Sequence, residues 1–156
     1  MYQRPHVMVV EARFYDDLAD ELYRNATAVL EAAGASHDRY AVAGVFEIPA
    51  AIKFALKSAE LFGAGPRYDG YLALGCVIRG ETTHYDYVCT ESARALQDLA
   101  VDHAAAIGYG ILTTENYQQA LARAQSGGNG KDRGGHAARA LLRQIELRRQ
   151  FRLDPR

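Results

Sequence analysis

The clearest structural signal in this chain is the run Gly75-Cys76-Val77-Ile78-Arg79-Gly80-Glu81-Thr82-Thr83-His84-Tyr85-Asp86-Tyr87. It joins an apolar segment, residues 71–78, to a polar turn and then to a pattern typical of a helix start. In open α/β sheets, ligands bind where the carboxyl ends of strands meet the amino ends of helices. The run therefore predicts both a parallel sheet and the position of its binding site.

The predicted helix begins at His84, and Thr83 is expected to cap it with Asp86 as its capping-box partner. The backbone N–H groups around Glu81 and Thr82 would then be free to hold an anion, helped by the helix dipole. The same dipole disfavours imidazolium at His84, and a neutral imidazole near pH 7 suits a proton shuttle. The turn therefore predicts a phosphate site beside an acid–base group. The alternative is a purely structural histidine at a helix start.

Working outward, strand and helix patterns alternate along the whole chain. Strands are expected over residues 6–12, 39–45, 69–78 and 109–113, and helices over 16–33, 49–62, 84–107, 115–124 and 136–151. This alternation predicts right-handed crossovers and a three-layer α/β/α sandwich with a four-stranded parallel sheet, in the flavodoxin-like order 2-1-3-4. The third strand is apolar almost throughout, as expected for a central strand. Residues 1–156 are expected to form a single domain.

Composition excludes several classes of function. The 18 basic and 19 acidic residues nearly balance, so no general attraction to nucleic acid or to a membrane is expected. The arginines of residues 143–156 are interpreted as a solvated helix face rather than a nucleic-acid patch. Cys76, Cys89 and the five histidines lack disulfide or metal-ligand spacing, so no metal is predicted. The sequence shows no membrane-spanning run and no signal peptide, which predicts a cytoplasmic protein.

Three other segments place unusual residues after a predicted strand. Phe14 follows the first strand and is either a core residue or a stacking platform for a flat heterocycle. Glu47 follows the second strand, where it is either a carboxylate favoured by a helix dipole or a hydrogen-bond acceptor for a polyol. Arg123 lies in the helix after the fourth strand and, taken alone, is a surface arginine. Together with the turn at His84, these segments outline a possible site at one end of the sheet.

In this order, the segments resemble the lumazine synthase family, whose members catalyse the penultimate step of riboflavin biosynthesis. The resemblance runs from about His6 to Gln150 and is densest over residues 73–88, with further support from 44–49 and 110–116. It implies a transferase that condenses 5-amino-6-(D-ribitylamino)uracil with 3,4-dihydroxy-2-butanone 4-phosphate. The implied products are 6,7-dimethyl-8-ribityllumazine, phosphate and water. No cofactor is implied.

The resemblance assigns roles on the heterocycle side of the site. Phe14 would stack on the pyrimidine, and Glu47 would hold the ribityl hydroxyls beside it. The remaining contacts would come from the walls of the pocket and from backbone groups of the central strand, at Val45, Phe46, Val77 and Ile78.

The resemblance also assigns a phosphate side. Glu81 and Thr82 would hold the phosphate through main-chain N–H groups, and Arg123 would pair with it as a charged clamp. Arg133 would supply further positive charge, although it stands where the family usually has lysine. His84 would move protons between the reacting groups.

Assembly is implied by the same resemblance. The family forms homo-pentamers with active sites between adjacent subunits, and some pentamers build icosahedral 60-subunit cages. Tyr109, where phenylalanine is usual, would close the pocket from the neighbouring subunit. The glycine-rich loop at 126–135 is longer than in cage-forming members, which favours a free pentamer. Tyr15 replaces a usual asparagine and His136 a usual acid, so their roles stay open.

Two other functions are compatible with parts of the sequence. The first is a flavin- or lumazine-binding protein without turnover, which would need neither the proton relay at His84 nor the clamp at Arg123. The second is a flavodoxin-like electron carrier or signalling domain, supported only by the alternation of strands and helices.

Overall fold

The computed structural model describes residues 3–63 and 67–153. Its strands are β1 (His6–Ala12), β2 (Ser36–Val42), β3 (Gly70–Ile78) and β4 (Ile107–Thr114). Its α-helices are α1 (Asp16–Ala32), α2 (Ile48–Phe62), α3 (His84–Asp102), α4 (Tyr117–Ala124) and α5 (Arg133–Gln150), and a short 3-10 helix covers Val45–Glu47. Helix α2 ends at Phe62, as predicted for the second helix, and residues 64–66 lie outside the described residues. Its C-cap, Gly63, has a left-handed backbone (φ 60°).

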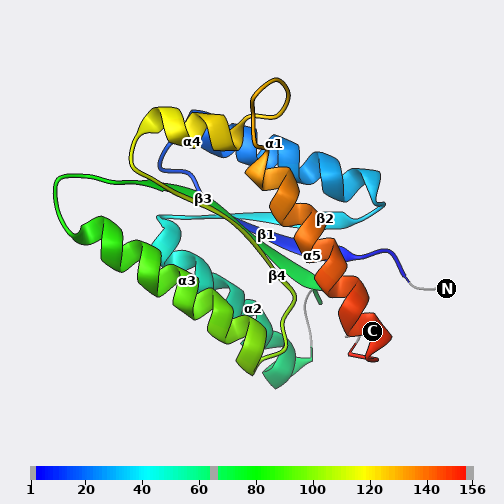
Figure 1. The fold of residues 1–156 in the computed structure, drawn as a ribbon. Coiled ribbons are helices and arrows are strands. Elements are labelled where there is room, and N and C mark those ends of the chain that lie inside the picture. The colour runs from blue at the N-terminus through cyan, green and yellow to red at the C-terminus, as the bar shows by residue number, and fades with distance from the viewer. Residues whose placement is uncertain (1–2, 64–66, 154–156) are drawn as a thin grey trace.

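The four strands form one parallel sheet in the order β2-β1-β3-β4. Helices α1, α4 and α5 lie on one face and α2 and α3 on the other, giving three layers (Figure 1). This confirms the predicted fold class and strand order. Among the described residues, no helix is long and apolar enough to cross a membrane.

The core is divided by the sheet into two main clusters. Alternate side chains of a strand point to opposite faces of the sheet, so each central strand contributes side chains to both clusters. Val7, Val9, Leu72 and Leu74 pack under α1 and α5. Met8, Val10, Tyr71 and Ala73 pack against α2 and α3. Every β3 residue from Gly70 to Cys76 is buried, as expected for a strand covered on both faces.

The second strand was predicted three residues too late. Strand β2 pairs with β1 from Ser36 to Val42, so its length is set by its neighbour. It lies at the edge of the sheet and is largely exposed, which explains its polar start and the absence of an apolar run there. Of the residues predicted to end it, 43 and 44 form a bend, and Val45 begins the short 3-10 helix that leads directly into α2.

Two helix boundaries differ from the sequence prediction by three residues or more. Helix α3 ends at Asp102 rather than near 107, because Ala104 adopts a left-handed backbone (φ 51°) despite the helix-favouring alanines around it. Helix α5 begins at Arg133 rather than at His136, with the Asp132 carboxylate accepting a hydrogen bond from the N–H of Gly135. A Cβ on Gly134 would lie 2.6 Å from the carbonyl oxygen of Leu22, so glycine permits the close approach of α5 to α1.

Candidate active site

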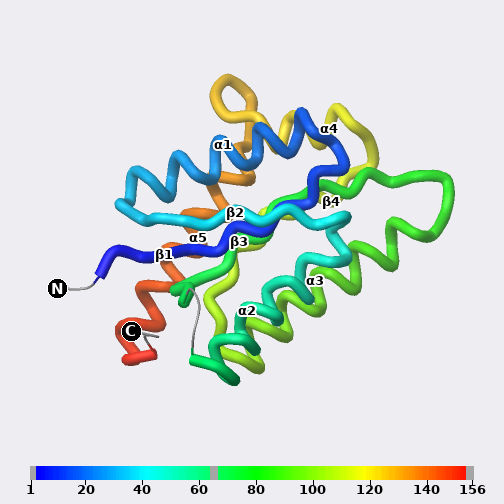
Figure 2. Tube along the Cα trace, turned by 180° about the vertical axis from the view of Figure 1, so that it is seen from behind, coloured from blue at the N-terminus to red at the C-terminus, as the bar shows by residue number. Residues whose placement is uncertain are grey.

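The carboxyl ends of the strands lie together at one end of the sheet, as the two views of the chain show (Figures 1 and 2). A pocket of about 560 Å³ opens at this end. Its sixteen lining residues come from the end of β1 and the turn after it, the segment around the 3-10 helix, and the end of β3 with the following turn and the start of α3. The volume suits a small organic ligand.

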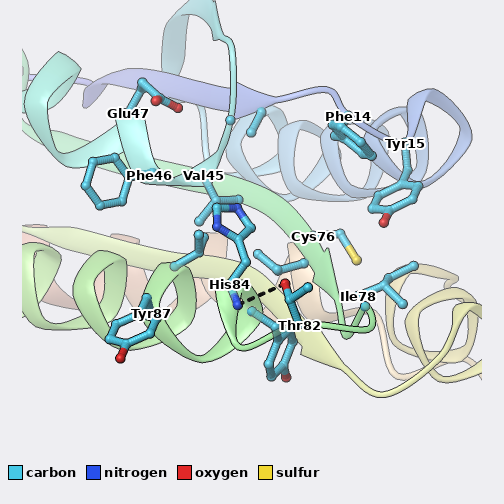
Figure 3. A pocket seen from close by; sticks show the side chains of 16 residues that line it. Phe14, Tyr15, Val45, Phe46, Glu47, Cys76, Ile78, Thr82, His84 and Tyr87 are labelled. Atoms are coloured by element: carbon cyan, nitrogen blue, oxygen red, sulfur yellow. Dashed lines mark hydrogen bonds between the residues drawn. The ribbon is translucent and has the colours of Figure 1, made fainter.

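All six residues predicted for the heterocycle side line this pocket (Phe14, Val45, Phe46, Glu47, Val77 and Ile78). Phe14 is 77% exposed, so its interpretation as a core residue is wrong. An exposed ring at a pocket wall is available for stacking on a flat ligand. The Glu47 side chain makes no capping hydrogen bond at the start of α2, which leaves its carboxylate free for a ligand (Figure 3).

The hydrogen bonding of the turn after β3 differs from the prediction. Thr83 is the N-cap of α3, but its backbone is already helical (φ −73°, ψ −2°) and its side chain makes no capping bond. An N-cap side chain usually needs an extended backbone to reach back to the helix, so the predicted capping box is wrong. The N–H of His84 instead donates to Oγ1 of Thr82 at 3.4 Å. Asp86 pairs with Arg79.

The same turn nevertheless presents free donors. Among the described residues, the backbone N–H groups of Glu81 and Thr82 donate to no protein acceptor. Thr82 lines the pocket, and Glu81 precedes it at the exposed edge. Unpaired N–H groups just before a helix are suited to bind an anion.

His84 projects from the first turn of α3 into the pocket, toward Val45 (Figure 3). Its imidazole therefore lies between the turn with the free N–H groups and the segment that carries Phe46 and Glu47. This position allows one side chain to exchange protons with ligand atoms bound on either side.

The pocket contains no strong cation of its own. Among its sixteen lining residues, the ionisable acid and base groups are Glu47 and His84, with three tyrosines and a cysteine, and no lysine or arginine lines it. Arg123 and Arg133 lie outside it, and Nη1 of Arg123 donates to the carbonyl of Gln119 on its own helix. Tyr109 lies in another hollow, beside α3. A single copy thus brings together the heterocycle side, Thr82 and His84, but not these three residues.

Comparison with known proteins places the chain in a family. Residues 4–149 match the family described as 6,7-dimethyl-8-ribityllumazine synthase. The chain belongs to this family. A protein of that name from Agrobacterium fabrum (strain C58 / ATCC 33970) is 54% identical over 95% of this chain and 97% of its own. 6,7-Dimethyl-8-ribityllumazine synthase 1 of Rhizobium meliloti (strain 1021) is 55% identical over 94% and 93%, respectively.

Several pocket residues were not singled out from the sequence as ligand contacts. Tyr87 and Val88 lie three and four positions after His84, and this spacing puts them on the same side of α3. Tyr15, which stands where the 6,7-dimethyl-8-ribityllumazine synthase family usually has asparagine, lines the pocket and packs edge-on against Phe14 (centroids 5.0 Å apart). The helical spacing could have identified the α3 residues, whereas the position of Tyr15 needed the structure.

Cysteine chemistry is not expected to contribute to the site. Cys76 lines the pocket, but burial raises the pKa of its thiol to about 11 from an ordinary 9.0. A raised pKa means less thiolate near neutral pH, and the thiolate is the reactive form. Within the described residues, no group of three or more His, Cys, Asp and Glu side chains could hold a metal ion.

We therefore expect iodoacetamide to alkylate Cys76 in the folded protein about a hundredfold more slowly than in urea at pH 8, the factor that two pKa units represent. Labelling of a Cys89→Ser variant, followed by intact-mass spectrometry, isolates Cys76 and measures both rates. Reaction of the folded and unfolded forms at the same rate would contradict the burial of this thiol.

Proposed function

We propose that this chain condenses 5-amino-6-(D-ribitylamino)uracil with 3,4-dihydroxy-2-butanone 4-phosphate to give 6,7-dimethyl-8-ribityllumazine, phosphate and water, the activity for which its family is named. The observation that carries the proposal is one pocket with an exposed aromatic ring, a free carboxylate, unpaired N–H groups and an imidazole. These groups suit, in turn, a flat ring, a polyol, a phosphate and a proton relay. The whole chain would form a single catalytic domain.

The chemistry requires these groups and no electron transfer. An amine of the uracil attacks the ketone and a first water leaves to give an imine. Phosphate is then eliminated, and the second amine closes the ring on the remaining carbonyl with loss of a second water. In this scheme Phe14 stacks on the pyrimidine, Glu47 accepts hydrogen bonds from the ribityl chain, and His84 carries protons between the reacting atoms. Orientation of the two substrates is worth up to about 7–11 kcal/mol in well-ordered systems.

The charge of the phosphate is the reason to propose that the site is shared between subunits. A phosphate needs a cation, and the pocket of one copy has no lysine or arginine in its lining. We infer that Arg123, Arg133 and Tyr109 reach the pocket of an adjacent subunit in a homo-oligomer. Phe46 and Tyr87 at the pocket wall are 59% and 70% exposed, which supports burial against a neighbouring copy.

The assembly is proposed to be a free pentamer rather than an icosahedral cage. The support is the glycine-rich loop before α5, which projects from the α1 and α4 layer (Figure 1). Its Gly127 and Gly128 have left-handed backbones. Native mass spectrometry is expected to give a five-subunit mass, and a 60-subunit particle in light scattering would contradict it. We also propose a cytoplasmic location, consistent with two free cysteines.

A two-substrate assay tests the proposed function. The purified protein is mixed with both substrates, and the absorbance and fluorescence of the lumazine product are followed with the release of inorganic phosphate. Formation of both products at equal rates supports the proposal. A yellow protein that binds a flavin or lumazine but forms no product would support the binding-protein alternative.

A further inference from the structure

Arg79 lies at the base of the loop that follows β3, and its side chain contacts residues on both neighbouring elements. We propose that Arg79 is a positioning residue that clamps the phosphate-binding turn, residues 80–83, to the start of α3 and to the end of β4. Through this clamp it would set the affinity for the phosphate-bearing substrate without contacting the phosphate. The inference rests on the proposed function, because it requires phosphate to bind at this turn.

Arg79 makes contacts in several directions. Its Nε donates to Oε2 of Glu115, just after β4, at 2.7 Å. Its Nη1 donates to Oδ1 of Asp86 in the first turn of α3 at 3.3 Å. The guanidinium carbon lies 4.3 Å from the centre of the Tyr85 ring, and the backbone N–H donates to the carbonyl of Thr114 at 2.9 Å. One side chain therefore fixes the strand end relative to both elements that flank the turn.

The turn itself has few other contacts: the carbonyl of Thr83 accepts from the N–H groups of Asp86 at 3.0 Å and Tyr87 at 3.4 Å. It projects beyond the end of the sheet in both views of the chain (Figures 1 and 2). Residues 80–83 are all exposed, and a Cβ added at Gly80 would meet no atom within 4 Å. The bond from the His84 N–H to Thr82 is long, at 3.4 Å. The placement of its N–H groups therefore depends on how the base of the turn is held.

The clamp is not expected to stabilise the fold much. The side chains of Arg79, Asp86 and Glu115 are 39%, 56% and 57% exposed, and exposed ion pairs contribute little to the free energy of unfolding. Loss of the clamp should therefore affect ligand binding much more than the melting temperature. This separates a positioning role from a structural one.

A direct role for Arg79 in binding phosphate and a clamp role predict opposite changes of phosphate affinity in a Glu115→Gln variant. If Arg79 bound the phosphate itself, a Glu115→Gln variant would release the guanidinium and tighten phosphate binding. Removal of a nearby negative charge acts in the same direction. If Arg79 is a clamp, Glu115→Gln loosens the turn and weakens binding despite this gain. The sign of the change therefore distinguishes the two roles.

The experiment compares wild type with Arg79→Met, Glu115→Gln and a matched control, Arg94→Met. Arg94 also binds two carboxylates, Glu91 and Asp98, on exposed α3, but does not line the pocket. For each protein we would measure kcat, both KM values, the melting temperature, the native mass, and the Kd of inorganic phosphate by calorimetry.

We expect KM for the butanone phosphate and Kd for phosphate to rise about tenfold in Arg79→Met and about threefold in Glu115→Gln. The reason is that displaced N–H groups of the turn bind the phosphate less well. KM for the uracil, kcat and the melting temperature should stay close to wild type, and Arg94→Met should be unchanged throughout. Unchanged or tighter phosphate binding in Glu115→Gln would overturn the clamp. Equal rises of both KM values in Arg79→Met, or a large fall in its melting temperature, would also do so. An inactive wild type would instead contradict the proposed function itself.

Discussion

A His84→Ala variant is expected to turn over about a hundred- to ten-thousandfold more slowly than wild type, yet to keep measurable activity. The imidazole projects into the pocket, and each step of the proposed reaction moves a proton. The residual activity should remain because the groups that hold and orient the two substrates are untouched, and orientation is the larger effect. Steady-state kinetics with both substrates measure the loss.

The control for this variant is His103→Ala. His103 lies beyond the end of α3 beside Lys53, outside the pocket, and its removal should leave kcat unchanged. Because His84 is exposed, the melting temperature of His84→Ala should match that of wild type. Complete loss of turnover in a folded His84→Ala protein would mean that proton transfer, and not orientation, dominates the rate enhancement.

The layers of the fold were predictable because their signals are local. The apolar run of β3 and the helix-like periodicity of α1 appear in the sequence with nearly the bounds that the structure gives. Strand β2 and the start of α5 were misplaced because non-local contacts decide them. The register with β1 sets the bounds of β2, and the closeness of Leu22 on α1 explains a helix that starts with glycines.

The candidate site was predictable to a similar degree. Residues after parallel strands converge because the sheet brings the ends of its strands together, so Phe14, Glu47 and His84 line one pocket although they are far apart in sequence. The hydrogen bonds of the turn were not predictable, because Thr83 has a helical backbone that its sequence does not reveal. The pairing of Arg79 with Glu115 links positions 36 residues apart, and local sequence gives no signal for it.

An Arg123→Ala variant is expected to raise KM for the butanone phosphate by roughly thirtyfold or more, with a smaller effect on kcat. Removing one member of a desolvated charge pair costs about 2 kcal/mol at least, which corresponds to that factor. KM for the uracil should change little, because this substrate carries no phosphate. Arg143→Ala is the control, since Arg143 is an exposed arginine of α5 paired with Glu146. Equal changes of both KM values in Arg123→Ala would argue against a phosphate clamp.

Mixing the two variants tests whether Arg123 acts across a subunit boundary. If each site combines His84 of one subunit with Arg123 of its neighbour, co-refolding equal amounts of His84→Ala and Arg123→Ala subunits leaves about one site in four with both residues intact, by the symmetry of a ring. Assayed at low butanone phosphate, the mixture should therefore recover about a quarter of wild-type activity. If both residues served the same chain, every site would lack one of them and mixing would restore nothing. Recovery of activity therefore requires a shared site, and a mixture no more active than its two components would contradict it.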